Sequence, residues 1–478
     1  SSDLGDETMK NLLTKIGGCT ICISLLFASC ETVDFGDENV NPNSPTNKKT
    51  DAMITSAITA IPGIVGAVDP TYYVQQISDV TYTTGSRYSD EQWSFDGFYT
   101  GALKDLQEVI DLNTKFPTEV TGGGSNANQI AVAHILMGYM YHNITDRWGA
   151  IPMSEALQGV DKIYPKFDLQ EDVYSQVMTN LDKAVGMIDG GGLKGDIMFN
   201  GDMNKWKMFA NTLKMRMALR MADVNPSAAQ TAFVAAWNAG VISSNAESVH
   251  YPYLTEDAHD NPWQDRFETR YDFVPSALLI DHLKANSDPR LAEFADGSLI
   301  SNGTEYVGLE YGLENPGILE TNLSGIDARV IKDGTNDGGY LMTYAEVCFA
   351  MSEAFLRGWS GLPGSAQLWY EYGIAASHGQ WGVASADASA YLASVAPVSM
   401  ETMATEKWVA LYMQGHEAWS EWRRLDYPVL TPATDALTGT GIPVRYGYGA
   451  TTASANKANH DAAVAKISGY SQDSKVWW

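Results

Sequence analysis

The chain has 478 residues, of which 45% are apolar and 19% charged, so it is long enough to bury a sizeable core. Its formal net charge of −27 argues against partners such as nucleic acid and against electrostatic adhesion to anionic membrane surfaces. Three of its four cysteines, Cys19, Cys22 and Cys30, lie near the N-terminus. Only Cys348 remains in the body, where its apolar neighbours predict a buried thiol and no intrachain disulfide is available.

The N-terminal region predicts an export signal. Residues 9–29 begin with Met9 and Lys10, and an apolar run from Ile16 to Ala28 follows, as in a secretory signal peptide. Small residues before Cys30 resemble a bacterial lipobox, in which the cysteine is lipidated. The alternative is an ordinary signal with a coincidental cysteine.

The flanking segments are assigned separately. Residues 1–8 are interpreted as a cloning remnant or an overextended start and are left out of the fold. Residues 30–46 are acidic and then rich in Asn and Pro, without helical periodicity, and predict a solvated, lipidated tether. No second apolar span of membrane length is expected, so the body should be soluble and held at the membrane by lipid.

The body, residues 47–478, predicts a mostly α-helical fold. A helical scaffold is expected over about 47–249 and 340–425, a loop-rich insert over about 250–339, and a C-terminal loop region over 426–478. Apolar periodicity and breaker residues place the helices. They are expected at 51–65, 98–112, 127–145, 169–188, 205–223, 228–239, 276–285, 344–358, 366–377 and 406–424.

The stretch Glu406–Pro428 is the most distinctive helix candidate. Its tryptophans, Trp408, Trp419 and Trp422, fall on one stripe with Gly415, which would let a neighbouring helix approach closely. This is typical of a core helix. The helix pairs together suggest a tetratricopeptide-like repeat scaffold, in which each pair buries its face against the next.

Six motifs in order carry a family resemblance. They are N-V-N-P-N-S-P-T (Asn39–Thr46), T-D-R-W-G-A-I-P (Thr145–Pro152), the stretch Lys205–Arg220, S-D-P-R (Ser287–Arg290), the stretch Tyr340–Ala354 and the stretch Glu406–Pro428. Behind a lipobox, this set resembles the SusD/RagB family of outer-membrane nutrient-binding lipoproteins, over nearly the whole chain.

The resemblance implies a fold and a function. The fold would be tetratricopeptide-like helix pairs with a loop-rich ligand-binding side. The protein would be anchored by lipid at the cell surface of the outer membrane. It would capture an oligosaccharide or an oligopeptide and act as a lid over a SusC-like TonB-dependent outer-membrane barrel. No catalysis and no cofactor are expected.

Two aromatic loops hold the candidate ligand-binding residues, because aromatic rings stack on sugar C–H faces and charged side chains bond to hydroxyls. The alternative for both loops is packing by their own aromatics. The first loop contributes Tyr82, Arg87, Tyr88 and Trp93. The second contributes Tyr253, Trp263, Asp265, Arg266 and Tyr271.

Other chemistries are weighed and set aside. Glu346 and Glu353 could act as an acid/base pair on a glycosidic bond, but we expect them to pair with scaffold cations such as Arg216 or Arg220. No close His/Cys cluster occurs, and Asp333–Gly338 only half-resembles a calcium loop, so no metal site is expected. A secreted α-helical glycoside hydrolase or lyase is the competing function, and a structural repeat protein is a third.

Overall fold

The computed structural model describes residues 48–478 except 90–91, 299–302, 332–338 and 440. The chain divides into two compact units, Ser1–Lys48 and Lys49–Trp478. The lipidation candidate Cys30 and the Asp333–Gly338 stretch both lie outside the described residues. All structural statements below concern the second unit.

The described part of this unit is mostly helical, as predicted, with three small two-stranded sheets. The helices are α2 (Thr50–Ile58), α3 (Pro62–Val65), α4 (Asp69–Tyr73), α5 (Asp96–Thr100), α6 (Ala102–Lys115), α7 (Asn126–Trp148), α8 (Gln170–Met187), α9 (Met203–Arg220), α10 (Pro226–Ala239), α11 (Pro262–Phe267), α12 (Ala277–Ala285), α13 (Leu291–Phe294), α14 (Ala328–Ile331), α15 (Tyr344–Leu356), α16 (Ala366–Gln380), α17 (Ser385–Leu392), α18 (Met400–Ala410), α19 (Gly415–Leu425), α20 (Ala450–Ala455) and α21 (Lys457–Val464).

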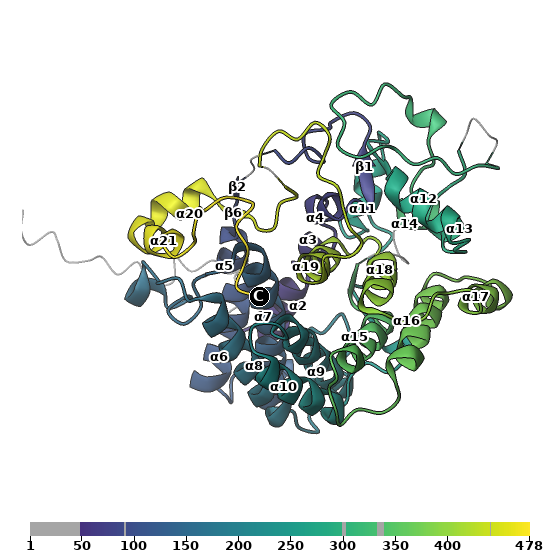
Figure 1. Ribbon diagram of the computed structural model, residues 1–478. Helices are drawn as coiled ribbons and strands as arrows, with labels where there is room; N and C mark the ends of the chain where they lie inside the picture. The colour runs from purple at the N-terminus through teal and green to yellow at the C-terminus, as the bar shows by residue number, and fades with distance from the viewer. Residues whose placement is uncertain (1–47, 90–91, 299–302, 332–338, 440) are drawn as a thin grey trace, which may run out of the picture. The chain divides into compact units, whose positions relative to one another are not determined.

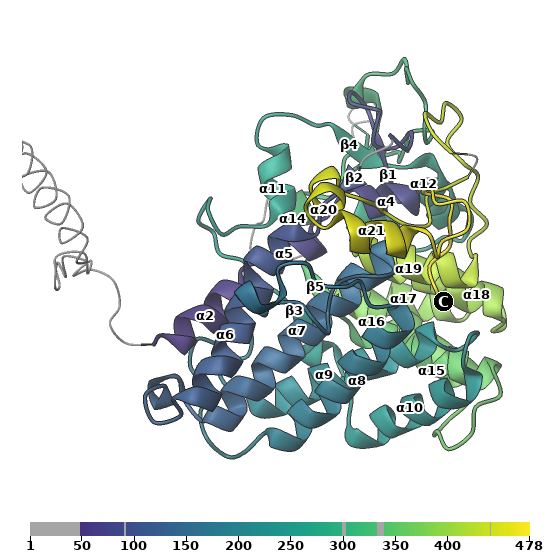
Figure 2. The same cartoon turned by 90° about the vertical axis from the view of Figure 1, so that its left-hand side faces the viewer.

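The scaffold is built from consecutive antiparallel helices. The pairs α6–α7, α7–α8, α9–α10 and α15–α16 are in contact, and α9 also contacts α7, α8 and α15. Figure 1 shows these helices gathered in the lower half of the molecule, with β1 and α11 to α14 above them. Figure 2 shows the same separation from the side. The helical scaffold and the loop-rich part therefore lie on different sides, as the family resemblance implied.

Local sequence explains where the scaffold helices begin. Ser125 caps α7 by accepting from the Asn128 amide, and Asp202 caps α9 by accepting from the Asn204 amide at 3.0 Å. Ser399 opens α18 with a reciprocal capping box to Thr402. Such side chains satisfy amide groups that have no partner inside the helix, which fixes the starting residue.

The predicted helix 406–424 is wrong as a single helix. The structure divides it into α18 and α19, and the break includes Met413 in the left-handed region at φ +64°. Gly415, the first residue of α19, is needed for a close approach to α4. A Cβ atom at this position would lie 2.8 Å from the Thr71 backbone nitrogen. The close approach predicted for Gly415 is thus confirmed.

Three further predictions about elements need correction. The turn expected at 146–152 begins later, because α7 continues to Trp148. The region 426–478 was expected to be loop but holds α20 and α21.

The stretch Thr50–Tyr73, with a mean hydropathy of 1.5, is long and apolar enough to cross a membrane by those two criteria alone, although no second such span was expected. In the structure it is divided among α2, α3 and α4.

The strands connect distant parts of the chain. They are β1 (Ile77–Asp79), β2 (Gln92–Trp93), β3 (Val249–His250), β4 (Phe273–Pro275), β5 (Tyr340–Met342) and β6 (Gly447–Tyr448). β1 pairs with β4 and β3 with β5, both antiparallel, and β2 pairs with β6 in parallel. The β1–β4 pair matters for function because it joins the two aromatic loops singled out in the sequence.

Candidate functional site

The two aromatic loops meet at one end of the β1–β4 pair. Asp79, the last residue of β1, lies opposite Phe273, the first residue of β4. The residues that follow β1 and those that precede β4 therefore leave the ladder on the same side. Tyr82 from the first loop and Arg270 from the second come into direct contact there: the Arg270 Nη1 donates to the Tyr82 hydroxyl at 2.8 Å.

We call Tyr82, Arg270 and Tyr271 the tyrosine–arginine surface. The Arg270 guanidinium carbon lies 4.7 Å from the centroid of the Tyr82 ring, and Arg270 also pairs with Asp272 at 2.9 Å. Tyr82 is 59% exposed and Tyr271 46% exposed. The exposed Tyr82 ring with the guanidinium bonded to it, and a second exposed ring on the next residue, Tyr271, can stack on a flat, hydroxyl-rich ligand and bond to its edge.

Tyr271 is held in place from beneath. Its ring meets Phe267 edge-on at 5.6 Å between centroids, and Phe267 in turn packs on Phe273 at 6.0 Å. Phe267 is buried and ends α11. The exposed ring of Tyr271 therefore packs against a buried aromatic cluster. This contact limits the conformational entropy that the side chain loses on binding.

Three predicted contact residues are buried instead. Tyr88 is fully buried at φ +61° and its hydroxyl accepts from the Ala433 amide at 3.0 Å. Trp263 is 1% exposed and Tyr253 5% exposed. We correct the prediction that these three contact ligand directly, since no ring face is open to solvent. They pack the loops, which was the stated alternative.

The remaining candidates are spread over the loops. Arg87 is largely buried and its Nε donates to the Asp435 carbonyl at 2.8 Å. Trp93 is half-buried, with its ring 6.0 Å from that of Tyr446. Asp265 is exposed, whereas Arg266 is half-buried with its guanidinium 4.9 Å from the Trp263 ring. The structure thus brings only Tyr82 and Tyr271 of the predicted set onto the tyrosine–arginine surface.

Arg270 is the residue of this surface that was not predicted from the sequence. It directly precedes Tyr271, and both residues follow α11. The signal available in the sequence was the position of Arg270 next to Tyr271, a candidate ligand-binding residue. Exposure could not be deduced, because it depends on which loop residue faces Tyr82 across the strand pair.

An acidic side chain lies beneath the first loop. Asp79 is buried and accepts from the Ser86 amide at 3.1 Å and from the Tyr72 hydroxyl. Burial raises the pKa of Asp79 to about 6, even though these two hydrogen bonds act to lower it. The carboxylate therefore links β1 to the start of the loop that carries Tyr82.

The two carboxylates considered for catalysis are engaged within the scaffold. Glu346 accepts two hydrogen bonds of 2.7 Å from Arg216, which confirms the predicted type of partner. Glu353 pairs with two other scaffold cations, Arg424 at 2.6 Å and Arg357 at 2.7 Å, so the predicted type of partner is confirmed for both carboxylates. Burial would raise the pKa of Glu353, but Arg424 outweighs it and the pKa falls to about 2. Both carboxylates are therefore held in ion pairs within the scaffold.

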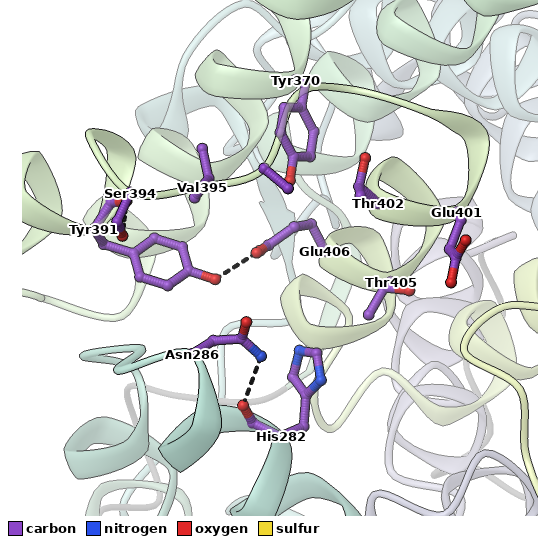
Figure 3. A pocket seen from close by; sticks show the side chains of 11 residues that line it. His282, Asn286, Tyr370, Tyr391, Ser394, Val395, Glu401, Thr402, Thr405 and Glu406 are labelled. Carbon is purple, nitrogen blue, oxygen red and sulfur yellow. Dashed lines mark hydrogen bonds between the residues drawn. The ribbon is translucent and has the colours of Figure 1, made fainter.

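A cavity of about 360 Å³ lies in the scaffold, between α12 and the helices α16 to α18. Figure 3 shows Tyr391 pointing at Glu406 inside it, with His282 and Asn286 on the opposite wall. The Tyr391 hydroxyl donates to Glu406 Oε1 at 2.5 Å, and Arg290 Nη2 donates to Oε2 at 2.6 Å. Both carboxylate oxygens of Glu406 are thus already bonded within the protein.

Comparison with known proteins identifies the family. Residues 42–449 match the model of a SusD-like family described as "Starch-binding associating with outer membrane". No curated protein sequence matches. A solved structure named a chitin-binding protein is 28% identical, with a TM-score of 0.79 over 90% of this chain and 99% of that chain.

Two further solved structures share the fold. A chitin-binding SusD homolog from Flavobacterium johnsoniae is 24% identical, with a TM-score of 0.73 over 90% of this chain and 98% of that chain. An outer membrane protein from Bacteroides vulgatus, titled as probably involved in nutrient binding, is 20% identical, with a TM-score of 0.79 over 90% and 100%. The match to the family model over residues 42–449 shows that the chain belongs to this SusD-like family, which is associated with the outer membrane.

Proposed function

We propose that this protein captures a glycan on the tyrosine–arginine surface. The observation that carries the proposal is the contact between Tyr82 and Arg270, which brings an exposed tyrosine of the first loop against the guanidinium that directly precedes the exposed Tyr271. Pyranose rings present C–H faces that stack on tyrosine, and guanidinium groups donate to hydroxyl oxygens. Two of the most similar structures are named chitin-binding, which supports a glycan over an oligopeptide.

Of the other predicted residues, Asp265 would extend this surface. It is exposed and lies on α11, five residues before Arg270. Its carboxylate could accept from sugar hydroxyls at the edge of the bound ligand. Arg87, Trp93 and Arg266 would act indirectly, by holding the loops that carry the surface.

The proposal includes delivery to an importer. The protein would sit at the cell surface through a lipid on Cys30 and close as a lid over a SusC-like TonB-dependent barrel. A tether of this kind keeps the binder at high effective concentration near its transporter, so modest affinity suffices. Replacing Cys30 by Ala should release the protein from membranes. Retention of the variant in the absence of a barrel would contradict lipid anchoring.

An exposed apolar loop supports a protein partner. Val160 is 87% exposed, Ile163 66% and Tyr164 64%. Val160 and Ile163 also line a mostly apolar cavity of about 530 Å³. Exposed apolar side chains grouped in this way are typical of an interaction surface. Ile163→Glu should reduce co-purification with the barrel and leave glycan binding intact.

The direct test uses matched tyrosines. Tyr82→Ala and Tyr271→Ala should each weaken binding of chito-oligosaccharides in calorimetry by about tenfold, as expected for loss of one stacking contact of roughly 1–1.5 kcal/mol. Tyr372→Ala is the control, because Tyr372 is 46% exposed like Tyr271 but lies on α16 in the scaffold.

Two results would contradict the proposal. If both loop variants bind as tightly as the wild type across glycan and peptide panels, the site is misplaced. Sustained release of shorter products from an oligosaccharide would favour the competing glycoside hydrolase or lyase.

A further inference from the structure

Four carboxylates converge around α11: Asp257 and Asp260 in the loop before it, Asp265 within it and Glu268 directly after it. Asp257, Asp265 and Glu268 each direct one carboxylate oxygen to a common point, and these three oxygens lie within 4.8 Å of one another. All three residues are exposed. Exposed acidic groups alone would need no explanation, because water solvates them and separates their charges.

The fourth carboxylate, Asp260, is the informative one. It is 6% exposed, and neither of its carboxylate oxygens has a hydrogen-bond partner among the described residues. Burial raises the pKa of Asp260, and the neighbouring Asp265, Asp257 and Glu268 raise it further. The charged form of a buried, unpartnered carboxylate that faces three others is unfavourable unless a cation joins the group.

No protein cation fills this role. In the part of the chain that the structure describes, we find no ion pair for Asp257, Asp260, Asp265 or Glu268. The nearby Arg266 directs its Nη1 to the Pro262 carbonyl at 2.8 Å and lies over the Trp263 ring. Arg270 bonds to Tyr82 and Asp272.

We propose that these four carboxylates form a binding site for one Ca²⁺ ion. The donors are all carboxylate oxygens, which suit hard cations, and calcium accepts six to eight oxygen ligands in irregular geometry. Magnesium requires near-octahedral geometry and gives up its water reluctantly, so an open loop suits it less. Zinc would favour nitrogen or sulfur ligands, and no histidine or cysteine belongs to the group.

The spacing of the ligands supports calcium independently. Asp257, Asp265 and Glu268 stand at positions one, nine and twelve of a twelve-residue stretch, as do three ligand positions of an EF-hand loop. Pro262 stands where that loop has its glycine, and Asn261 caps α11 by accepting from the Trp263 amide at 3.0 Å. The site is therefore not an EF-hand. The proposal replaces the sequence-based expectation that no metal is bound.

The site lies next to the tyrosine–arginine surface. Glu268 directly follows α11, and Arg270 and Tyr271 come two and three residues later. An ion held by Asp257 and Glu268 would tie the two ends of this stretch together. Calcium should therefore order the segment that presents Arg270 and Tyr271. This consequence rests on the proposed glycan site, whereas the calcium site itself does not.

The test is calcium binding by the purified protein after treatment with EDTA and dialysis. Calorimetry with CaCl₂ alone should show one ion per chain, with a Kd between about 10 µM and 1 mM, and the melting temperature should rise with calcium. MgCl₂ at the same concentration should give a smaller rise.

Two variants and one control make the test specific. Asp260→Asn and the double variant Asp257→Asn/Glu268→Gln should each weaken calcium binding at least tenfold, because fewer charged ligands remain. Glu256→Gln is the control, since Glu256 is exposed and adjacent to Asp257 but outside the group. Asp260→Asn removes a buried charge, so it should fold without difficulty.

The outcomes separate the two proposals. No calcium-dependent heat and no rise in melting temperature for the wild type would overturn the calcium site, as would unchanged calcium binding in both variants. If calcium binds as expected but Tyr82→Ala and Tyr271→Ala do not affect glycan binding, the calcium site stands and the glycan site is wrong.

Discussion

The scaffold and the loop-rich side differ in whether their buried charged groups have partners. In the scaffold, Arg216 and Glu346 are both about 95% buried and form two hydrogen bonds of 2.7 Å. On the loop-rich side, Asp260 is equally buried, yet both of its oxygens have no partner among the described residues. Buried charges that are paired stabilise a fold only through their partners, whereas buried charges without a partner point to a missing ligand.

The difference shows where function resides. Paired scaffold charges hold helices together: Arg220 of α9 pairs with Asp146 of α7 and with Glu417 and Glu421 of α19. On the loop-rich side, the exposed rings of Tyr82 and Tyr271 and the carboxylates around α11 are, among the described residues, groups open to a ligand. Each prediction below changes one side of this contrast.

The largest effect is expected from breaking a scaffold pair. Arg216→Leu should lower the free energy of unfolding by about 3–5 kcal/mol, because it leaves Glu346 buried and unpaired. Arg216→Leu/Glu346→Leu should recover much of that loss in chemical denaturation. If the double variant is no more stable than the single one, the pair does not account for the burial of Glu346.

The next effect concerns pH. Because the pKa of Asp79 is raised to about 6 from near 4 in the unfolded chain, the folded state holds this proton more tightly. Its contribution to stability is present below about pH 4 and is lost as pH rises to about 6, a change of roughly 3 kcal/mol. Asp79→Asn should flatten this part of the stability profile. A profile identical to that of the wild type would contradict the raised pKa.

A smaller effect is expected at the contact between α4 and α19. Gly415→Ala should cost about 1–3 kcal/mol, because the new Cβ meets the Thr71 backbone and one of the two helices must move. Gly63→Ala is the matched control, since a Cβ there meets nothing within 4 Å. In thermal denaturation, only Gly415→Ala should therefore melt at a lower temperature than the wild type.

The smallest effect has the opposite sign. Without calcium, Asp260→Asn should raise the free energy of unfolding by about 1 kcal/mol, because it removes a buried charge that has no partner. With calcium in excess, the wild type should become the more stable of the two. A variant that is less stable than the wild type in EDTA would contradict an unpaired carboxylate.

The scaffold was largely predictable from the sequence. Helical periodicity located α8, α9 and α15 to within a few residues, and the partner type of Glu346 was correct. The break between α18 and α19 was not predictable, because Leu411 and Tyr412 continue the apolar pattern through it. Tertiary contacts with α4 set the path of the chain there.

The functional side was less predictable. The sequence identified both aromatic loops. Nothing in the sequence around the buried Tyr88 and Trp263 distinguishes them from the exposed Tyr82 and Tyr271. Burial follows from the β1–β4 pairing, which joins residues about 200 positions apart. The spacing of Asp257, Asp265 and Glu268 was visible, but Pro262 in place of a glycine concealed its likeness to a calcium loop.

The central claim is that ligand binding belongs to the loop-rich side. Its most direct test is calorimetric titration of calcium-loaded wild type, Tyr82→Ala/Tyr271→Ala and Tyr372→Ala with chito-oligosaccharides. We predict that the double variant loses binding about a hundredfold, roughly twice the free energy of one ring, while Tyr372→Ala binds like the wild type. Equal affinity of the double variant and the wild type would contradict the account.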